Sequence, residues 1–431
     1  IRAVALTDGG GYEQRYGAID EGGKLNINSL IALDPTGEVL YNALLKVPNM
    51  TPEIADAIVD WVDADDTKRA SGAESAEYQS LPNPYKAKNG PLNSLDELLL
   101  VQGVTPDLLY GGDRNRNGVF DDGEASTDRG WSDYLTVYGR ELNVDMAGTV
   151  RTYLNGDNLT TLQQQLTQQV GDELTTYILA AKLYTVTATD ASGNLPSTTA
   201  AIVTSGGGGS MTITISGAQP KAKPVRAATA DELRAAVQAK MATTFTGGKR
   251  IRSVADLLYS RITLPRPAGA KAEDPDVVAF SPMLANPALF ATLLDRTTVK
   301  QAVELVPRIN VNSAPREVLM AVPNMTDELA DAIIAARPGL APTDPATVSG
   351  AWLITAAGVT PATYKKMEKY ITGTSMVYRV QSVGYLAEGG PVARMEAVID
   401  TNQGAPRFLH VRDLSELDSP RGFEPMRSAN P

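Results

Sequence analysis

The sequence predicts an α+β fold, in which both ends of the chain form an antiparallel sheet that a large helical region interrupts. Three observations predict it. Apolar and polar residues alternate near both ends, as in half-buried strands, and apolar residues recur at helical spacing between them. Two stretches of the helical region are also nearly the same in sequence, which indicates a repeated unit.

The strands of the expected sheet come from opposite ends of the sequence. Four runs are predicted to form them: 14–28, 375–387, 392–400 and 407–414. In the third run, Met395, Ala397 and Ile399 are expected on one face, because successive side chains of a strand alternate between faces. His410, the one histidine of the chain, lies in the fourth run and is interpreted as a strand residue.

Two long stretches of the helical region repeat each other. Residues 25–62 and 309–337 share Asn-x-Asn-Ser, Val-Pro-Asn-Met-Thr and Glu-x-Ala-Asp-Ala-Ile, in that order. Each is followed by a second element with Gly-Val-Thr-Pro, at 93–109 and 348–367, and a weaker third copy is expected in 141–184. Short motifs repeated in the same order predict a repeated supersecondary unit.

Each repeat is predicted to contain two helices joined by a tight turn. Thr51 and Thr326 are candidate N-caps of the second helix, and Pro52 suits its first position. A short helix ending near Leu45 or Met320 precedes each turn. The inserted region is therefore expected to carry helix-hairpin-helix-like repeats.

Helix-hairpin-helix motifs that bind nucleic acid use a glycine-rich turn whose amides meet a phosphate. Here the turns are Pro48–Asn49–Met50 and Pro323–Asn324–Met325, which contain no glycine, and proline lacks an N–H. The net charge of −11 also disfavours a polyanion. A packing role is predicted instead, with no nucleic acid as partner.

Composition excludes several classes of function. Hydrophobic residues make up 43% and charged residues 21% of the 431 residues, which indicates a globular chain. Without cysteine and with one histidine, the chain has no thiolate site and no histidine-based triad. Aromatic residues are only 6%, which argues against a carboxylate-based glycosidase. No catalytic residue is predicted, and no stretch reaches the roughly 18 apolar residues of a membrane span.

Residues 113–124 match the D-x-[DN]-x-[DN]-G-x5-E calcium loop. The predicted ligands are Asp113, Asn115, Asn117, Val119 through its carbonyl, Asp121 and Glu124. Arg114 and Arg116 occupy non-ligand positions and are expected to point to solvent. A lone loop with no partner loop predicts a structural staple and not a sensor. The alternative is a polar turn without metal.

A second acidic cluster follows the first repeat. Its predicted calcium ligands are Asp60, Asp63, Asp65 and Glu74. Carboxylates this close repel one another unless a cation or basic groups lie between them. The alternative is a solvated helix end, although negative charge there opposes the helix dipole.

The order of several phrases carries a family resemblance. They are "YGAIDEGGKLNINS", "DAIVDWVDADD", "LPNPYKAKNGPLNSLDELLLVQGVTPDLL", "RINVNSAPREVLMAVPN", "YRVQSVGY" and "VARMEAVID". Together they resemble the K-type minor pseudopilins of bacterial type II secretion systems (general secretion pathway protein K). The resemblance covers about 25–125 and 305–415.

The resemblance implies a pilin-like body interrupted by a large α domain, on a long hydrophobic N-terminal helix. The present chain resembles the periplasmic soluble part, with an inner-membrane anchor expected upstream. Family members bind two other minor pseudopilins, of the I and J types, at the pseudopilus tip, help to start its assembly, and resemble calcium binders. A DNA-receptor module and a calcium-dependent surface scaffold of another kind remain as alternatives.

The resemblance and the repeats together predict five segments. They are the first part of the pilin-like body (1–30), the first α unit with the calcium loop (31–140), an insertion (141–300), the second α unit (301–373), and the C-terminal strands and tail (374–431). Within the insertion, 228–242 and 253–262 are predicted helices. Whether Gly206–Ser210 is a natural flexible loop stays open.

Overall fold

The computed structural model divides into two compact units: Ile1–Asn143 with Ala302–Pro431, and Val144–Gln301. The first unit therefore contains both ends of the chain, and the second is one continuous stretch. The residues that the structure describes are 3–6, 12–15, 17–113, 116, 129–195, 224–244, 246–266, 269–271, 273–337, 344–384, 393–402 and 404–417.

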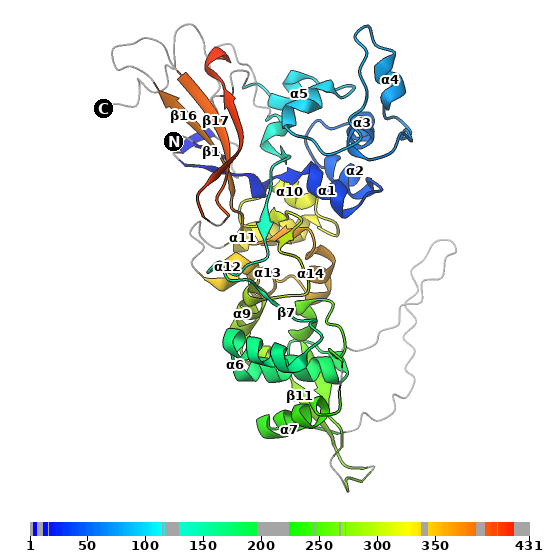
Figure 1. Cartoon of the computed structure of the whole chain (residues 1–431), viewed down its shortest axis with the longest axis vertical. Helices are drawn as coiled ribbons and strands as arrows, with labels where there is room; N and C mark the ends of the chain where they lie inside the picture. The colour runs from blue at the N-terminus through cyan, green and yellow to red at the C-terminus, as the bar shows by residue number, and fades with distance from the viewer. Residues whose placement is uncertain are drawn as a thin grey trace. The chain divides into compact units, whose positions relative to one another are not determined.

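The main sheet of the first unit joins the two ends of the chain. Its strands, in the order β18-β17-β16-β3, are β18 (Arg407–Asp413), β17 (Ala393–Asp400), β16 (Val377–Gly384) and β3 (Ile19–Asp20). All neighbours are antiparallel, with Asp20 opposite Tyr378 across the β3–β16 pair. A hairpin of β1 (Ala3–Leu6) and β2 (Tyr12–Arg15) precedes it, and Figure 1 shows the blue start of the chain beside the orange and red strands. The predicted sheet from both chain ends is confirmed.

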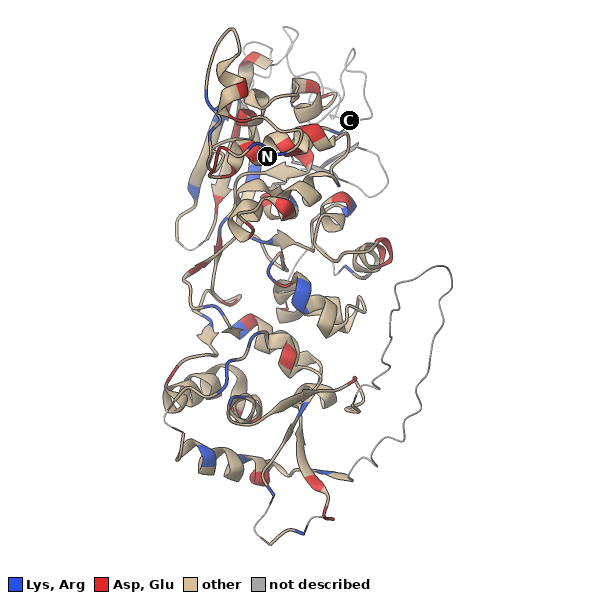
Figure 2. Ribbon diagram, turned by 90° about the vertical axis from the view of Figure 1, so that its right-hand side faces the viewer, with Lys and Arg blue, Asp and Glu red and all other residues tan. Residues whose placement is uncertain are grey.

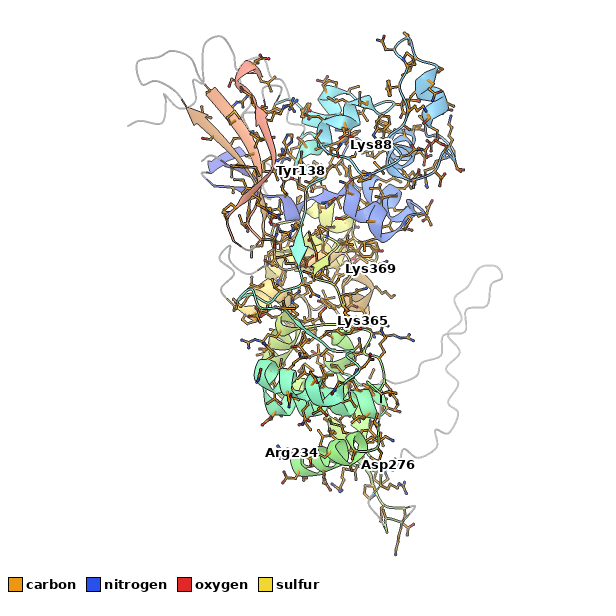
Figure 3. All side chains as sticks on the ribbon, viewed as in Figure 1. Lys88, Tyr138, Arg234, Asp276, Lys365 and Lys369 are labelled. Carbon is orange, nitrogen blue, oxygen red and sulfur yellow. The ribbon has the colours of Figure 1, made fainter. Side chains whose placement is uncertain are left out.

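One face of this sheet is covered by the unit's own core. On β17, Glu396 and Val398 are buried, whereas Met395 is 40% exposed. Tyr138, labelled in Figure 3, packs its ring 5.4 Å from the ring of His410 on β18. His410 is thus a strand residue, as expected.

The two long repeats form matching helix pairs. The pair is α2 (Glu38–Leu44) with α3 (Pro52–Val62) in the first repeat, and α10 (Arg316–Met320) with α11 (Asp327–Ala336) in the second. The first repeat has a further helix, α1 (Ile27–Leu33), before its pair. Thr51 and Thr326 cap α3 and α11 as predicted, each accepting a backbone N–H at 3.3 Å. Asn49 and Asn324 hold φ of 61° and 68°, a left-handed conformation that asparagine tolerates better than most residues. The positive φ thus explains why both Val-Pro-Asn turns have asparagine at this position.

Each repeat is closed by a short parallel strand pair. In the first, β4 (Leu25–Asn26) pairs with β5 (Leu135–Thr136); in the second, β14 (Ile309–Asn310) pairs with β15 (Ile371–Thr372). The asparagine that ends β4 or β14 accepts a nearby backbone N–H through its side chain. Asn26 thereby caps α1, whereas Asn310 accepts the N–H of Asn312 in a turn, so the first shared asparagine of Asn-x-Asn-Ser makes a local backbone bond in both repeats.

Short elements complete the first unit. They are η1 (Glu21–Gly23), α4 (Ser75–Gln79), η2 (Leu95–Leu100), α5 (Pro106–Tyr110), η3 (Trp131–Asp133), β6 (Glu141–Leu142), β13 (Glu304–Leu305), α12 (Pro345–Ser349), α13 (Trp352–Thr355), α14 (Pro361–Met367) and η5 (Ser415–Leu417). The core of the first repeat contains Leu40, Leu44 and Ile58, all fully buried. These residues recur at helical spacing, so α2 and α3 bury one apolar face each.

The second unit has its own sheet and helices. Its strands are β7 (Thr152–Tyr153), β8 (Val186–Ala188), β9 (Val225–Ala227), β10 (Ser260–Thr263), β11 (Asp276–Phe280) and β12 (Thr297–Thr298). Its helices are α6 (Leu159–Leu183), α7 (Ala230–Met241), η4 (Val254–Leu257), α8 (Pro282–Ala285) and α9 (Ala288–Arg296). The four-stranded sheet has the order β8-β10-β11-β9. No described helix of the chain is long and apolar enough to cross a membrane.

Predictions within the second unit had mixed outcomes. The helix expected at 228–242 is confirmed as α7. The helix expected at 253–262 is wrong: after one 3-10 turn the chain enters β10, where Ile262 is fully buried opposite Ala279. The weaker third copy, expected in 141–184, contains β6, β7 and α6, and the helical path of α6 is interrupted at Gly171, where φ is 81°. Gly206–Ser210 lies outside the described residues.

Candidate metal centre

Helix α3 carries two carboxylates one turn apart, on its buried side. Asp56 is 6% exposed and Asp60 is fully buried. Residues four apart lie on the same helix face. Asp63 follows at the C-cap, where its backbone N–H donates to the carbonyl of Val59 at 2.9 Å. The end of α3 therefore presents acids where the helix dipole is already negative.

The segment after α3 folds back over these acids. The backbone N–H of Arg69 lies 3.2 Å from both carboxylate oxygens of Asp60. A Cβ on Gly72 would collide with Oδ2 of Asp60, so no other residue fits there without movement. This close approach brings Glu74, at the start of α4, next to the end of α3.

The result is a compact acidic centre, formed by Asp60, Asp63 and Glu74. One carboxylate oxygen from each lies within 4.8 Å of the other two. Glu74 is 3% exposed. Both of its carboxylate oxygens, and Oδ1 of Asp63, are buried without any hydrogen-bond partner among the described residues. Buried acceptors left unpaired are rare and costly, so the centre calls for a cation or for protons.

The raised pKa values of the acidic centre also indicate that it needs a cation or protons. Burial, reinforced by the charges of Asp60 and Asp63, raises the pKa of Glu74 to about 7. Burial also raises the pKa of Asp60 to about 6, with Asp56 adding to the effect, and that of Asp63 to about 6, with Asp65 adding to it. Without a counter-ion, the centre therefore holds protons near neutral pH.

Neighbouring basic residues do not neutralise the acidic centre, because their side chains pair with other acids. Arg69 Nε lies 2.8 Å from Asp56 Oδ1, and Lys68 Nζ lies 2.9 Å from Glu77 Oε1. Figure 2 shows how acidic and basic residues are distributed on the ribbon. Three carboxylates thus face one another without a basic side chain paired to them in the described part of the chain.

The donor set fits calcium. Ca²⁺ prefers carboxylate and carbonyl oxygens in flexible geometry, and the chain has no cysteine to offer a softer ligand. Asn89 lies against the segment after α3, where its Nδ2 donates to the carbonyl of Asp65 at 2.9 Å, and its Oδ1 is buried without a described partner. A calcium ion would be held by Asp60, Asp63 and Glu74.

Asp65, predicted as a fourth ligand, is not part of the acidic centre. Its side chain is exposed and accepts the backbone N–H of Thr67 at 2.7 Å, as aspartate commonly does in turns. This local bond also lowers the pKa of Asp65. The structure therefore brings together three of the four predicted residues.

The second repeat lacks the centre. Asp331 occupies the position of Asp56 and also pairs with an arginine, Arg316, whose Nε lies 2.8 Å from its Oδ1. Four residues further on, however, Ala335 stands where the first repeat has Asp60. The two repeats therefore share helices and caps, but the acidic centre is formed in the first repeat and not in the second.

The predicted loop at 113–124 lies mostly outside the described residues. Asn115, Asn117, Val119, Asp121 and Glu124 are among those not described, so their role stays a prediction. The expectation that Arg116 points to solvent is wrong, because its guanidinium lies 3.5 Å from the centre of the ring of Tyr110 on α5. The side chain is 19% exposed, since an aromatic face attracts a cation away from water.

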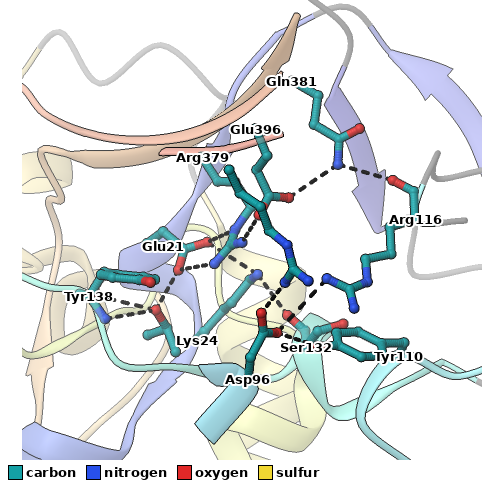
Figure 4. A network of polar contacts seen from close by, with 12 residues as sticks. Glu21, Lys24, Asp96, Tyr110, Arg116, Ser132, Tyr138, Arg379, Gln381 and Glu396 are labelled. Carbon is teal, nitrogen blue, oxygen red and sulfur yellow. Dashed lines mark hydrogen bonds and ion pairs between the residues drawn. The ribbon is translucent and has the colours of Figure 1, made fainter. Parts of the chain in front are cut away.

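A second polar network joins the sheet to the first repeat, and no sequence pattern indicated it (Figure 4). Glu21 is fully buried, and its carboxylate lies 2.8 Å from Arg379 Nε and 3.2 Å from Lys24 Nζ. Burial would raise the pKa of Glu21, but Lys24 and Arg379 outweigh it and lower the value to about 2. Arg379 also pairs with Glu396 at 2.7 Å, so the network ties η1 to β16 and β17.

Comparison with known proteins finds similarity in both long repeats. Two family models described as type II secretion system (T2SS), protein K, match residues 23–110 and 309–353. A curated type II secretion system protein K from Pectobacterium carotovorum subsp. carotovorum is 33% identical over 95 residues, which are 21% of this chain. That alignment covers 28% of the curated relative, so the match spans under a third of its length.

A solved structure is also similar to the chain. It is the crystal structure of the GspK–GspI–GspJ complex from the enterotoxigenic Escherichia coli type 2 secretion system, with a TM-score of 0.33 and 13% identity. The similarity covers 92% of this chain and 78% of that one.

The two family matches fall on the two long repeats. The first contains the whole acidic centre and the second contains the helix pair α10 and α11. Both descriptions name a secretion-system component and indicate no catalytic family. The predicted resemblance is confirmed: both long repeats match family models of type II secretion system protein K.

Proposed function

We propose that the chain is the periplasmic part of a minor pseudopilin at the tip of the type II secretion pseudopilus. There it promotes pseudopilus assembly and protein export through protein–protein contacts. The observation that carries the proposal is the pairing of β3 with β16. It joins the two ends of the chain in one sheet, and the helical region lies between these strands in the sequence. A pilin-like body interrupted in this way is what the family resemblance implies.

Other minor pseudopilins, of the I and J types, are the proposed partners, and an inner-membrane anchor is proposed upstream. Support comes from the matches of both repeats to protein K family models, and the similar solved protein K is in a complex with GspI and GspJ. The helix pairs α2 with α3 and α10 with α11 are proposed to be helix-hairpin-helix-like units used for packing.

A binding assay with purified proteins tests this function. The purified chain, immobilised, should retain its cognate I- and J-type minor pseudopilins at about 150 mM salt. Failure to retain either, together with tight binding of double-stranded DNA at that salt, would favour the DNA-receptor alternative. The turns argue against that alternative, because Asn49 and Asn324 take the place of the glycines that would approach a phosphate.

We also propose that the chain binds calcium as a structural staple at two places. The acidic centre of Asp60, Asp63 and Glu74 is one, supported by its unpaired buried oxygens. The loop at 113–124 is the other, supported by its sequence pattern. Affinities of about 10⁻⁴–10⁻³ M, as in extracellular modules, would suit a periplasmic protein.

Thermal unfolding tests the loop. Calcium in excess, compared with chelator, should raise the unfolding midpoint of the wild type more than that of Glu124→Gln, because the variant loses the bidentate ligand. Equal calcium shifts in both proteins would exclude the loop as a calcium staple.

A further inference from the structure

Arg69 contacts two helices of the first repeat, α3 and α2. Its backbone N–H lies 3.2 Å from both oxygens of Asp60, and its Nε lies 2.8 Å from Asp56 Oδ1. Its Nη2 lies 2.8 Å from Oε1 of Glu38, at the start of α2. Its guanidinium carbon also lies 4.9 Å from the centre of the Tyr41 ring on the same helix.

We propose that Arg69 is a positioning residue of the acidic centre, which fixes the segment after α3 so that Asp60, Asp63 and Glu74 meet. Through its contacts with α2, it also transmits ion binding to that helix. The inference rests on the proposed calcium binding at the acidic centre.

The position of Arg69 in the chain supports the first part. It lies between Asp63 and Glu74 in sequence, within the segment that must fold back over α3. Its ion pair with Asp56 is largely buried, with the two side chains 19% and 9% exposed. Removing the arginine side chain would leave Asp56 buried without its charged partner, with only the backbone N–H of Ser71 donating to it at 3.1 Å, and the segment would lose its ion pair with α3.

The second part rests on the contact between α2 and α3. A Cβ on Gly37, just before α2, would collide with Cγ1 of Val59, so the start of α2 is packed directly on α3. Arg69 spans this junction through Glu38 and Tyr41. A cation over an aromatic face and an ion pair together favour one placement of the guanidinium.

Positioning and simple charge predict opposite effects on calcium affinity. As a positive charge, Arg69 repels a cation, so its removal would tighten calcium binding. As a positioning residue, it prearranges the ligands, so its removal would weaken binding in spite of the lost repulsion. A lysine, which keeps the charge but cannot form the same fork, separates the two accounts.

The test is calcium titration by isothermal calorimetry in a Glu124→Gln background, which silences the predicted loop. Arg69→Met and Arg69→Lys should each raise the Kd of the remaining site about 10-fold. Arg316→Met is the matched control, because Arg316 holds the equivalent aspartate of the repeat without the acidic centre; its Kd should stay unchanged. Tighter binding in Arg69→Met, with parental binding in Arg69→Lys, would overturn the positioning role.

Hydrogen exchange tests the link to α2 in the same proteins. In the parent, calcium should slow exchange both at 63–79 and at 34–44. In Arg69→Met, the effect at 34–44 should disappear while a reduced effect at 63–79 remains at saturating calcium. Calcium-dependent protection of 34–44 that survives in Arg69→Met would overturn this inference alone. A parent that binds no calcium at the acidic centre would overturn the proposed calcium function, and this inference with it.

Discussion

Replacing Glu74 with glutamine is expected to stabilise the calcium-free protein near pH 8 and to weaken its response to calcium. Glutamine keeps the shape of the side chain but carries no charge. In the wild type, the carboxylate of Glu74 is buried with both oxygens unpaired among the described residues. Its ionisation is therefore costly unless a cation is present.

The magnitude follows from the pKa. Burial and the neighbouring acids raise the pKa of Glu74 from 4.5 to about 7. A group whose pKa rises on folding contributes its full stability below its unfolded pKa, and that stability is lost as the pH rises through the folded value. At about 1.4 kcal/mol per pH unit, the loss of stability approaches about 3.5 kcal/mol above pH 7. Asp60 and Asp63 titrate together with Glu74, so the cost of ionisation is divided among the three acids. Substitution of Glu74 is therefore expected to raise the free energy of unfolding by about 1–3 kcal/mol.

Thermal unfolding in chelator at pH 5 and pH 8 measures this gain. A shift of roughly 2–4 °C per kcal/mol is expected, so Glu74→Gln should melt several degrees above wild type at pH 8 and close to it at pH 5. Excess calcium should reverse the order at pH 8, because the variant lacks a ligand. Glu77→Gln is the control, since Glu77 pairs with Lys68 on the surface and should show no such gain. A variant that melts at or below wild type in chelator at pH 8 would contradict this expectation.

Three further predictions follow from the same structure. Gly72→Ala should weaken calcium binding at the acidic centre, because the added Cβ collides with a ligand carboxylate; titration calorimetry measures this, and an unchanged Kd would speak against it. Asn49→Ala and Asn324→Ala should each cost about 1–2 kcal/mol in denaturant unfolding, whereas glycine at either position should cost far less, because φ is positive at both. Arg379→Ala should cost about 3–5 kcal/mol at pH 7 by leaving Glu21 short of its main partner. Because the pKa of Glu21 is lowered from 4.5 to about 2, its contribution is present above pH 4.5 and is lost as the pH falls towards 2, so the variant's deficit should shrink over that window.

Features that depend on local pattern were predictable from sequence. The helix caps at Thr51 and Thr326 follow from residue type and position, and both were confirmed. The sheet from both chain ends followed from period-2 alternation and was confirmed by the β3–β16 pairing. Asp60, Asp63 and Glu74 were predicted as a cluster because they lie within 15 residues of one another in sequence.

Features that depend on distant partners were not predictable. Glu21 and Arg379 lie 358 residues apart, so no spacing rule joins them. Asp65 was grouped with its neighbours by proximity, but a turn hydrogen bond to Thr67 directs its side chain elsewhere. Arg116 was expected in solvent from its place in a loop pattern, whereas Tyr110 on a neighbouring helix holds it. In each case tertiary packing or a turn hydrogen bond, and not spacing alone, determines the direction of the side chain.

Long-wavelength diffraction from crystals grown with calcium would locate the ion itself, because calcium scatters anomalously there. An anomalous peak is expected about 2.3–2.6 Å from carboxylate oxygens of Asp60, Asp63 and Glu74. Crystals saturated with calcium in which no peak lies within bonding distance of these oxygens, and in which the three acids share protons instead, would show that the acidic centre is not a calcium site.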